Sequence, residues 1–362
     1  MSDLAKHSPQ FCLTVPHHHS LSAFASAYLF VAPHIETEFD VSREYVIAGF
    51  VVYVAMWGFG PLVWAPLSSN IGRKPVYIFS SAAWTLCNIG CVRAPGIKTL
   101  IACRFLSGLL GSGCLCNGSG SNADMFVGHA RTRAIALYIG MVYLGPVIGP
   151  IFGGAVSTYA PTVPNAGWRW IFYGAIIGGV VVTIGHCLIM ETNHNIRLRT
   201  RVRTLRNEQE RQITKKEKSL GESRIGRRGP IPVHFTTEED CFGASLSTIM
   251  RGVVVGAARM LFEEPIILFI SLWQTTVSAV VYLFFEGFNI VFAEGHGFTP
   301  FQTGLCFIGV GVGMLSACAW ACTGDLKLWD LRVVKHNGDP TPEMRVPQGL
   351  AGAVMTVVGL FW

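Results

Sequence analysis

Long hydrophobic blocks separated by short polar joints make up most of the chain. The blocks cover residues 11–35, 45–66, 76–93, 98–122, 134–160, 169–190, 265–292, 301–322 and 347–362. A helix needs about 20 apolar residues to cross the roughly 30 Å hydrocarbon core of a membrane, and most blocks approach that length. Ten-residue segments of alternating polarity, which mark membrane barrels, do not occur. The pattern therefore predicts an all-α membrane protein.

The two outermost blocks give the weakest predictions. The first contains Pro16 followed by His17, His18 and His19. Consecutive helical residues point in different directions, so these imidazoles cannot converge on one metal ion, and we expect no metal site and no cofactor. The last block would form only about 24 Å of helix, which is short of a full span.

Composition supports a membrane protein. The chain is 51% hydrophobic and 14% charged, with a mean hydropathy of +0.43. A soluble domain has about 25% charged residues, so an ordinary globular protein is excluded. Most of the eleven cysteines lie inside or beside apolar blocks, where we interpret them as packing residues. The polar N-terminal tail shows no cleavable signal peptide.

Lysine and arginine concentrate in alternate joints and in the long polar stretch 191–260. The positive-inside rule places these segments in the cytoplasm, together with the N-terminus. The basic run 197–228 can then lie on anionic lipid, and it accounts for much of the net charge of +6. Because this run is tethered between membrane spans, we expect no binding to nucleic acid.

The order of the blocks indicates a transporter built from two six-helix halves. We expect residues 1–190 to form a complete N-terminal half of six helices. Residues 191–260 would be a basic cytoplasmic linker. Residues 261–362 would be an incomplete C-terminal half, with two full helices and part of a third.

The joint at residues 65–74 reads Ala-Pro-Leu-Ser-Ser-Asn-Ile-Gly-Arg-Lys. Gly72 is free to adopt a positive φ in a tight turn, while Arg73 and Lys74 hold the turn at the cytoplasmic face. Any membrane hairpin could use such residues. Further motifs follow in order: Leu100-x-x-x-Arg104-x-x-x-Gly108, Gly145-Pro146-Val147-Ile148-Gly149-Pro150 with Gly153-Gly154, Trp168-Arg169-Trp170-Ile171-Phe172, Glu264-Pro265 and Pro342-Glu343-x-Arg345.

Taken together, these motifs resemble the major facilitator superfamily in its fungal twelve-span drug:proton antiporter form. The resemblance runs from about residue 25 to the end of the chain. It implies a proton-coupled secondary transporter that exports small organic compounds, such as drugs, polyamines or toxins, across the plasma membrane. It also implies a monomer in the lipid bilayer whose partners are substrate and protons.

Two positions depart from the family pattern. Ala65 stands where the family has glycine, and Ser69 stands where it has an acid. In the family that acid pairs with cations and helix ends to close the inner gate. We therefore expect the inner gate loop, which contains Ser69, Gly72, Arg73 and Lys74, to be loosely held.

Arg104 is the first candidate for the transport path. A guanidinium within a span costs at least about 2.5–3.5 kcal/mol unless it faces a polar interior. Snorkelling to the membrane interface is the alternative, since Arg104 lies near the start of its block. The resemblance implies that Arg104 faces inward and takes part in proton coupling.

Two acidic residues are further candidates. Glu286 lies well inside its block, where a carboxylate either carries a proton or lines an outer vestibule. Asp124 is close in sequence to Arg131 and Arg133 and is predicted to form a salt bridge that fixes the loop.

Glycines recur at every fourth residue of the fifth block. Gly145, Gly149 and Gly153 share one helix face, which allows close approach of a neighbouring helix. Pro146 and Pro150 remove backbone hydrogen bonds and favour bending. The pattern indicates helix packing, and the resemblance adds the hypothesis of an antiporter-type hinge.

Two alternatives remain at this level. The chain could be a non-transporting membrane fragment, because helices of the second half are missing from the pattern. An intramembrane serine protease would need a serine such as Ser119 or Ser121 within hydrogen-bond reach of His186.

Overall fold

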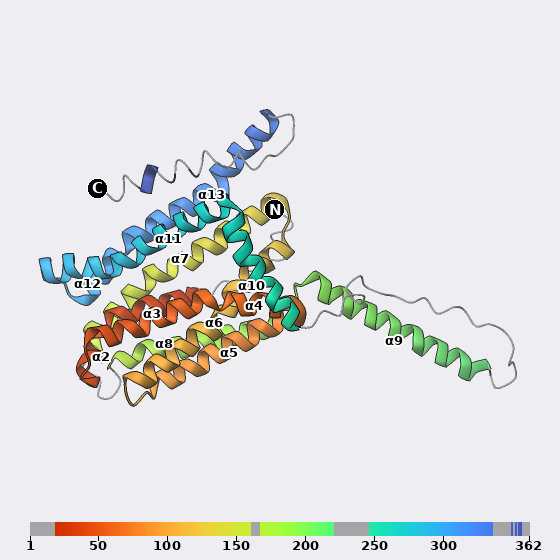
Figure 1. Ribbon diagram of the computed structural model, residues 1–362, viewed down its shortest axis with the longest axis horizontal. Helices are drawn as coiled ribbons and strands as arrows, with labels where there is room; N and C mark the ends of the chain where they lie inside the picture. Colours follow the sequence, from red (N-terminus) through yellow and green to blue (C-terminus); the bar gives the residue numbers. More distant parts are fainter. Residues whose placement is uncertain are drawn as a thin grey trace.

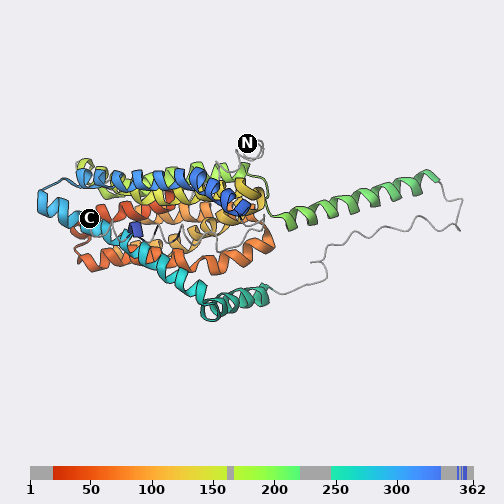
Figure 2. The same ribbon diagram turned by 90° about the horizontal axis from the view of Figure 1, so that it is seen from above.

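The computed structural model describes residues 19–160, 167–220 and 246–335, together with 349, 352 and 354–356. All regular structure within these residues is helical. Most of the helices lie side by side in one elongated bundle, and α9 projects away from one end (Figures 1 and 2). The prediction of an all-α architecture is confirmed for the described residues.

The helices follow the predicted blocks closely. After helical residues 19–30 come α2 (Ala32–Phe39), α3 (Arg43–Phe59), α4 (Pro61–Ile71), α5 (Arg73–Val92), α6 (Ile97–Met125), α7 (Gly128–Tyr159), η1 (Gly167–Arg169), α8 (Trp170–Leu188), α9 (His194–Leu220), α10 (Leu246–Glu263), α11 (Pro265–Phe288), η3 (Asn289–Glu294), α12 (Pro300–Cys306) and α13 (Ile308–Lys335). Six helices among the described residues are long and apolar enough to cross a membrane, or up to seven if α3 and α4 form one bent span.

One predicted block is interrupted by a local break that its hydropathy did not indicate. The block expected at 45–66 is two helices, α3 and α4, that meet at an angle of 40°. Gly60 and Pro61 lie at this break, and proline cannot donate the hydrogen bond that would continue α3. A Cβ on Gly60 would lie 1.7 Å from Ser112 Oγ, so the missing side chain of Gly60 also lets the chain approach α6.

The polar stretch 191–260 contains two helices that the search for apolar blocks missed. The basic helix α9 extends away from the bundle, and the amphipathic helix α10 packs against α4 (Figure 1). The first of the two outermost blocks is described only from residue 19, so Pro16, His17 and His18 lie outside the described residues. Most of the last block does as well.

The two ends of the bundle differ in their chemistry. We call the end where α4 meets α5 the Arg73 end, and the opposite end, where α2 meets α3, the Arg43 end. Near the Arg43 end an aromatic and aliphatic core forms around Tyr28, Tyr53 and Phe172. Among the described residues Phe285 is the one buried side chain of α11, whose remaining apolar side chains are partly or fully exposed.

A polar clasp closes the Arg43 end. Trp168 Nε1 and Arg169 Nη1 both donate hydrogen bonds to Glu38 Oε2, at 2.6 and 2.8 Å, and Arg169 Nη2 lies 2.6 Å from Glu38 Oε1. The hydrogen bonds from Arg169 hold the pKa of the Glu38 carboxyl below its ordinary value. The clasp therefore ties α2 to η1, which directly precedes α8.

We expect Glu38→Gln to lower the unfolding temperature of the purified protein slightly at pH 7. Because the Glu38 side chain is 41% exposed, the loss should stay within about 1 kcal/mol. A depressed folded pKa stabilises the fold above the unfolded value of 4.5 and ceases to do so as the pH falls through the folded pKa. The difference between the two proteins should therefore shrink below pH 4.5, and a constant difference would contradict this explanation.

Candidate functional site

Arg104 lies inside the bundle in a cage of aromatic rings. Its guanidinium carbon is 4.0 Å from the centre of the Tyr28 ring, 4.7 Å from that of Tyr53 and 5.8 Å from that of Phe172. The residue is 2% exposed. Gly108, one turn further along α6, allows α6 to pack closely on α3 here, because a Cβ on Gly108 would lie 2.3 Å from the backbone oxygen of Tyr53.

The charge of Arg104 has no counter-ion among the residues that the structure describes. Its Nε and Nη2 atoms are buried without a hydrogen-bond partner. Three rings replace water around the cation, and such cation–π contacts are worth about 2 kcal/mol when they are desolvated. Arg104 thus occupies the interior position that its predicted role needs, while the role itself stays a prediction.

A cavity of about 310 Å³ lies among helical residues 19–30, α3, α6, α7 and α11. Its lining is aromatic and aliphatic with a few hydroxyls: Ser22, Ala25, Trp57, Leu115, Tyr138, Ile139, Val142, Tyr143, Pro146, Ser278, Val281 and Tyr282. None of these residues carries a charge. A volume of this size and an apolar wall with few polar groups are typical of a small-molecule site.

Residues of the cavity wall carry several hydrogen-bonding groups, among them the Trp57 ring N–H and the Tyr143 hydroxyl. Trp57 Nε1 is buried and has no partner. Gln274 donates through Nε2 to the Tyr143 hydroxyl at 2.8 Å, so this hydroxyl acts as acceptor in that bond and keeps its own proton for another acceptor. A molecule with an acceptor atom could therefore be oriented by the wall.

The cavity adjoins the Arg104 cage through a single ring. The Trp57 ring centre is 6.4 Å from that of Tyr53, and the Arg104 guanidinium lies 4.7 Å from the Tyr53 ring centre. Sequence motifs included Arg104 and, as part of the hinge hypothesis, the cavity residue Pro146, but they did not point to the other cavity residues. A regular motif could not reveal them, because they come from five different segments.

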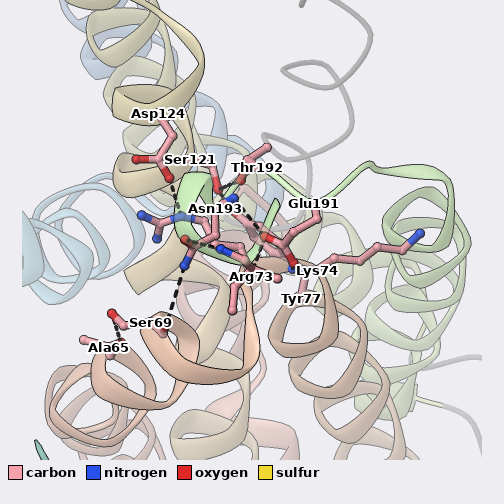
Figure 3. A network of polar contacts seen from close by, with 11 residues as sticks. Ala65, Ser69, Arg73, Lys74, Tyr77, Ser121, Asp124, Glu191, Thr192 and Asn193 are labelled. Atoms are coloured by element: carbon pink, nitrogen blue, oxygen red, sulfur yellow. Dashed lines mark hydrogen bonds and ion pairs between the residues drawn. The ribbon is translucent and has the colours of Figure 1, made fainter. Parts of the chain in front are cut away.

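The predicted inner gate loop lies at the Arg73 end in a network of polar contacts (Figure 3). Gly72 has φ 109°, which is strained for any residue with a Cβ. It leads into α5, whose first backbone N–H groups, those of Arg73 and Lys74, donate to Glu191 Oε1 and Oε2 at 3.0 and 3.1 Å. A carboxylate at a helix N-terminus is stabilised by the helix dipole.

Glu191 is a residue that the sequence analysis missed. It places an acid beside the start of α5, although it comes from the link between α8 and α9 rather than from the loop. The Ser69 hydroxyl donates to the carbonyl of Ala65 in its own helix, at 3.1 Å. The only available signal was position, since Glu191 directly follows the sixth hydrophobic block. The expectation of a loosely held loop took no account of this acid.

The predicted partner of Asp124 was wrong. Asp124 Oδ2 accepts a hydrogen bond from Arg73 Nε at 2.7 Å (Figure 3), rather than pairing with Arg131 or Arg133. Gly120 allows Arg73 to pair with Asp124, because its missing side chain leaves room on α6 for the Arg73 guanidinium. The basic pair belongs instead to the first turns of α7, beyond the extended link that ends α6.

We expect Glu191→Gln to loosen the Arg73 end. The variant loses the negative charge at the start of α5, which should cost about 1 kcal/mol and lower the unfolding temperature. Cys116, partly buried on α6 one turn before Gly120, should react faster with a maleimide when labelling is followed by peptide mass spectrometry. Glu208→Gln on the exposed face of α9 is the matched control, and equal behaviour of both variants would contradict the role of Glu191.

Glu286 lies near the Arg43 end and forms an ion pair with Arg43 Nη2. The two side chains are 42% and 48% exposed, so both are reachable by water or by the polar edge of a bilayer. The pair joins the start of α3 to the second half of α11. Within the described part of the chain, Glu286 makes no contact with Arg104, the other predicted residue of the transport path.

The glycine face of α7 packs against helical residues 19–30. A Cβ on Gly145 would lie 1.8 Å from Ser22 Oγ, one on Gly149 2.3 Å from the oxygen of Ala23, and one on Gly153 2.5 Å from the oxygen of Ala27. The helix continues through Pro146 and Pro150 without interruption. These close contacts are what the packing interpretation of the glycines predicts, and the hinge stays a prediction.

The serine–histidine alternative can be tested by distance. His186 Nδ1 lies 3.2 Å from Ser81 Oγ, a serine that the sequence analysis did not consider. The Ser81 hydroxyl donates to the carbonyls of Tyr77 and Ile78, so its proton is directed at backbone rather than at the imidazole. Ser121 instead contacts the Tyr77 hydroxyl at 3.0 Å. Within the described chain, no three or more His, Cys, Asp or Glu side chains form a group that could hold a metal ion.

Comparison with known proteins agrees with this architecture. The sequence profile described as Major Facilitator Superfamily matches residues 19–362. The chain is 31% identical over 341 residues to the efflux pump FUB11 of Gibberella moniliformis, covering 93% of this chain and 53% of that protein. It is 32% identical over 347 residues to the multidrug transporter mdrA of Aspergillus fumigatus, covering 95% and 52%.

Among solved structures, a crystal structure of a D-xylose-proton symporter matches with a TM-score of 0.44 and 13% identity, covering 89% of this chain and 82% of that one. The chain spans about half the length of the fungal relatives it matches. Members of the matched family are transporters, so the serine protease alternative is wrong. On the profile match, which covers nearly the whole sequence, this multi-pass membrane chain belongs to the Major Facilitator Superfamily.

Proposed function

We propose that this protein exports small organic compounds in exchange for protons, with the aromatic cavity as its substrate site. The main support for this proposal is the position of the cavity: it has a volume of about 310 Å³, its lining is uncharged, and it lies between the first helices and α11. In such transporters the substrate binds at the interface of two helix groups, and movement of one group against the other exposes the site to each side of the membrane in turn. The relatives are named efflux pump and multidrug transporter, which supports the direction and the breadth of substrates.

Proton coupling is assigned to the Glu286–Arg43 pair. A proton on Glu286 would cancel its charge and break the ion pair that holds α11 to the start of α3. One helix group could then move against the other. Arg104 cannot be the proton carrier, since a guanidinium stays protonated in proteins. It would act as a fixed positive charge beside the substrate path.

The proposal includes an arrangement of the parts. Residues 1–190 would move as one half and residues 261–362 as part of the other, connected by residues 191–260. The loop with Arg73 and Lys74 and the basic helix α9 share one end of the bundle, and the positive-inside rule then favours the cytoplasm for that end and for the N-terminus. We place the protein in the plasma membrane as a monomer.

Reconstitution in liposomes tests this function. We expect an imposed proton gradient to drive movement of aromatic compounds above the rate in empty vesicles, and Glu286→Gln to remove the dependence on the gradient. Glu294→Gln, an exposed acid in η3, is the matched control and should behave like the wild type. Equal rates with and without a gradient in the wild type would refute the coupling.

A further inference from the structure

The lining of the cavity is uncharged, and a buried positive charge lies behind it. None of its twelve lining residues is acidic or basic, so the lining itself offers no carboxylate to neutralise an entering ammonium group. The buried charge that lies behind the wall is positive: Arg104 is one ring away, separated from Trp57 by Tyr53. A buried charge of this kind acts over longer distances than it would in water, because the surroundings screen it poorly.

The hydrogen-bonding groups of the wall have the same preference. Trp57 Nε1 can only donate, and it is buried without a partner. The Tyr143 hydroxyl already accepts from Gln274 Nε2 and has its own proton to donate. An acceptor on the substrate would satisfy both groups, whereas an ammonium group could bond only to hydroxyl oxygens of the wall, such as that of Tyr143, and would leave Trp57 Nε1 without a partner.

The aromatic wall sets the shape of the remaining part of the substrate. Trp57, Tyr138, Tyr143 and Tyr282 contribute rings to a cavity of only about 310 Å³. Flat rings pack well against such surfaces, and a long flexible chain would lose more conformational freedom on entering.

We propose that the cavity selects small aromatic carboxylates over neutral and cationic compounds of the same shape. This inference rests on the proposed function, in that it names the substrate class of the same site. It separates the substrates that the family resemblance left open: polyamines lack both the ring and the negative charge. The carboxylate would lie toward Trp57, on the side of the Arg104 cage.

Three ligands with one ring system test the proposal: 1-naphthoate, 1-naphthamide and 1-naphthylmethylammonium. We expect equilibrium binding of the radiolabelled ligands to the purified chain in uncharged phosphatidylcholine nanodiscs at pH 7 to be at least tenfold tighter for the carboxylate than for the ammonium compound, with the amide between them. Equal or reversed order, or no binding of any of the three, would overturn the proposal.

Variants identify the groups responsible. Arg104→Gln should reduce the preference for naphthoate over the ammonium compound to less than threefold, and Arg104→Lys should keep most of it. Trp57→Phe keeps a ring but removes the donor, so it should weaken binding of both naphthoate and naphthamide. Trp320→Phe, on an exposed part of α13, is the matched control and should change nothing. If Arg104→Gln does not fold, the lysine variant and the ligand order still decide.

The test separates this inference from the proposed function. Binding order requires no proton gradient and no movement of the helices. A protein that binds naphthoate most tightly but transports nothing would refute the exporter and keep the cavity's selectivity. A protein that transports all three compounds at equal rates and binds them equally would keep the exporter and refute the selectivity.

Discussion

Replacing Arg104 with methionine is expected to reduce proton-driven transport at least tenfold while the protein remains folded. The two effects on stability nearly cancel. Removing a guanidinium from within a span recovers about 3 kcal/mol. Losing its contacts with Tyr28, Tyr53 and Phe172 costs about 2 kcal/mol. The unfolding temperature of the purified variant should therefore be unchanged or slightly higher.

This combination distinguishes a functional residue from a structural one. A buried charge without a counter-ion is seldom retained for stability, because apolar replacements of buried charges are often neutral or stabilising. Arg104→Lys preserves the charge and should retain part of the transport. Arg93→Met, at the exposed C-terminal end of α5, is the matched control and should alter neither property. Wild-type transport by Arg104→Met, or a clear loss of stability, would contradict the role.

The helices could be predicted from the sequence because length and hydropathy decide where a chain crosses a bilayer. The break between α3 and α4 was less visible, although Gly60 and Pro61 mark it. Helix α10 was missed because its apolar residues follow one face instead of forming a continuous block, so an average over the window hides them.

The candidate site shows a sharper limit of sequence reasoning. Arg104 was found because a charge within an apolar block is conspicuous by itself. Glu191 and Trp57 were missed, since each gains its role from a partner far away in sequence: Glu191 from the start of α5, and Trp57 from a cavity shared with α7 and α11. The predicted partner of Asp124 failed for the same reason. Proximity in sequence favoured Arg131, but packing of α5 against α6 brings Arg73 closer.

The second large effect is expected at the seam between α7 and helical residues 19–30. In this seam the atoms that face a new side chain belong partly to the backbone, so they cannot rotate away. A Cβ on Gly149 would lie 1.9 Å from Ser26 Oγ and 2.3 Å from the oxygen of Ala23. The two helices must therefore separate even for an alanine, the smallest possible addition.

We expect Gly149→Ala to destabilise the protein by about 1–3 kcal/mol, the usual range for overpacking. Thermal unfolding of purified protein in detergent measures this loss. Gly313→Ala on α13 is the matched control, because a Cβ there meets nothing within 4 Å. It should be neutral or stabilising by up to about 1 kcal/mol, the intrinsic preference of a helix for alanine over glycine. Adding Ser26→Ala to Gly149→Ala should restore little, since the Ala23 oxygen remains in place. Full rescue by that second change, or equal unfolding temperatures for the two glycine variants, would show that the close backbone contact does not hold the seam together.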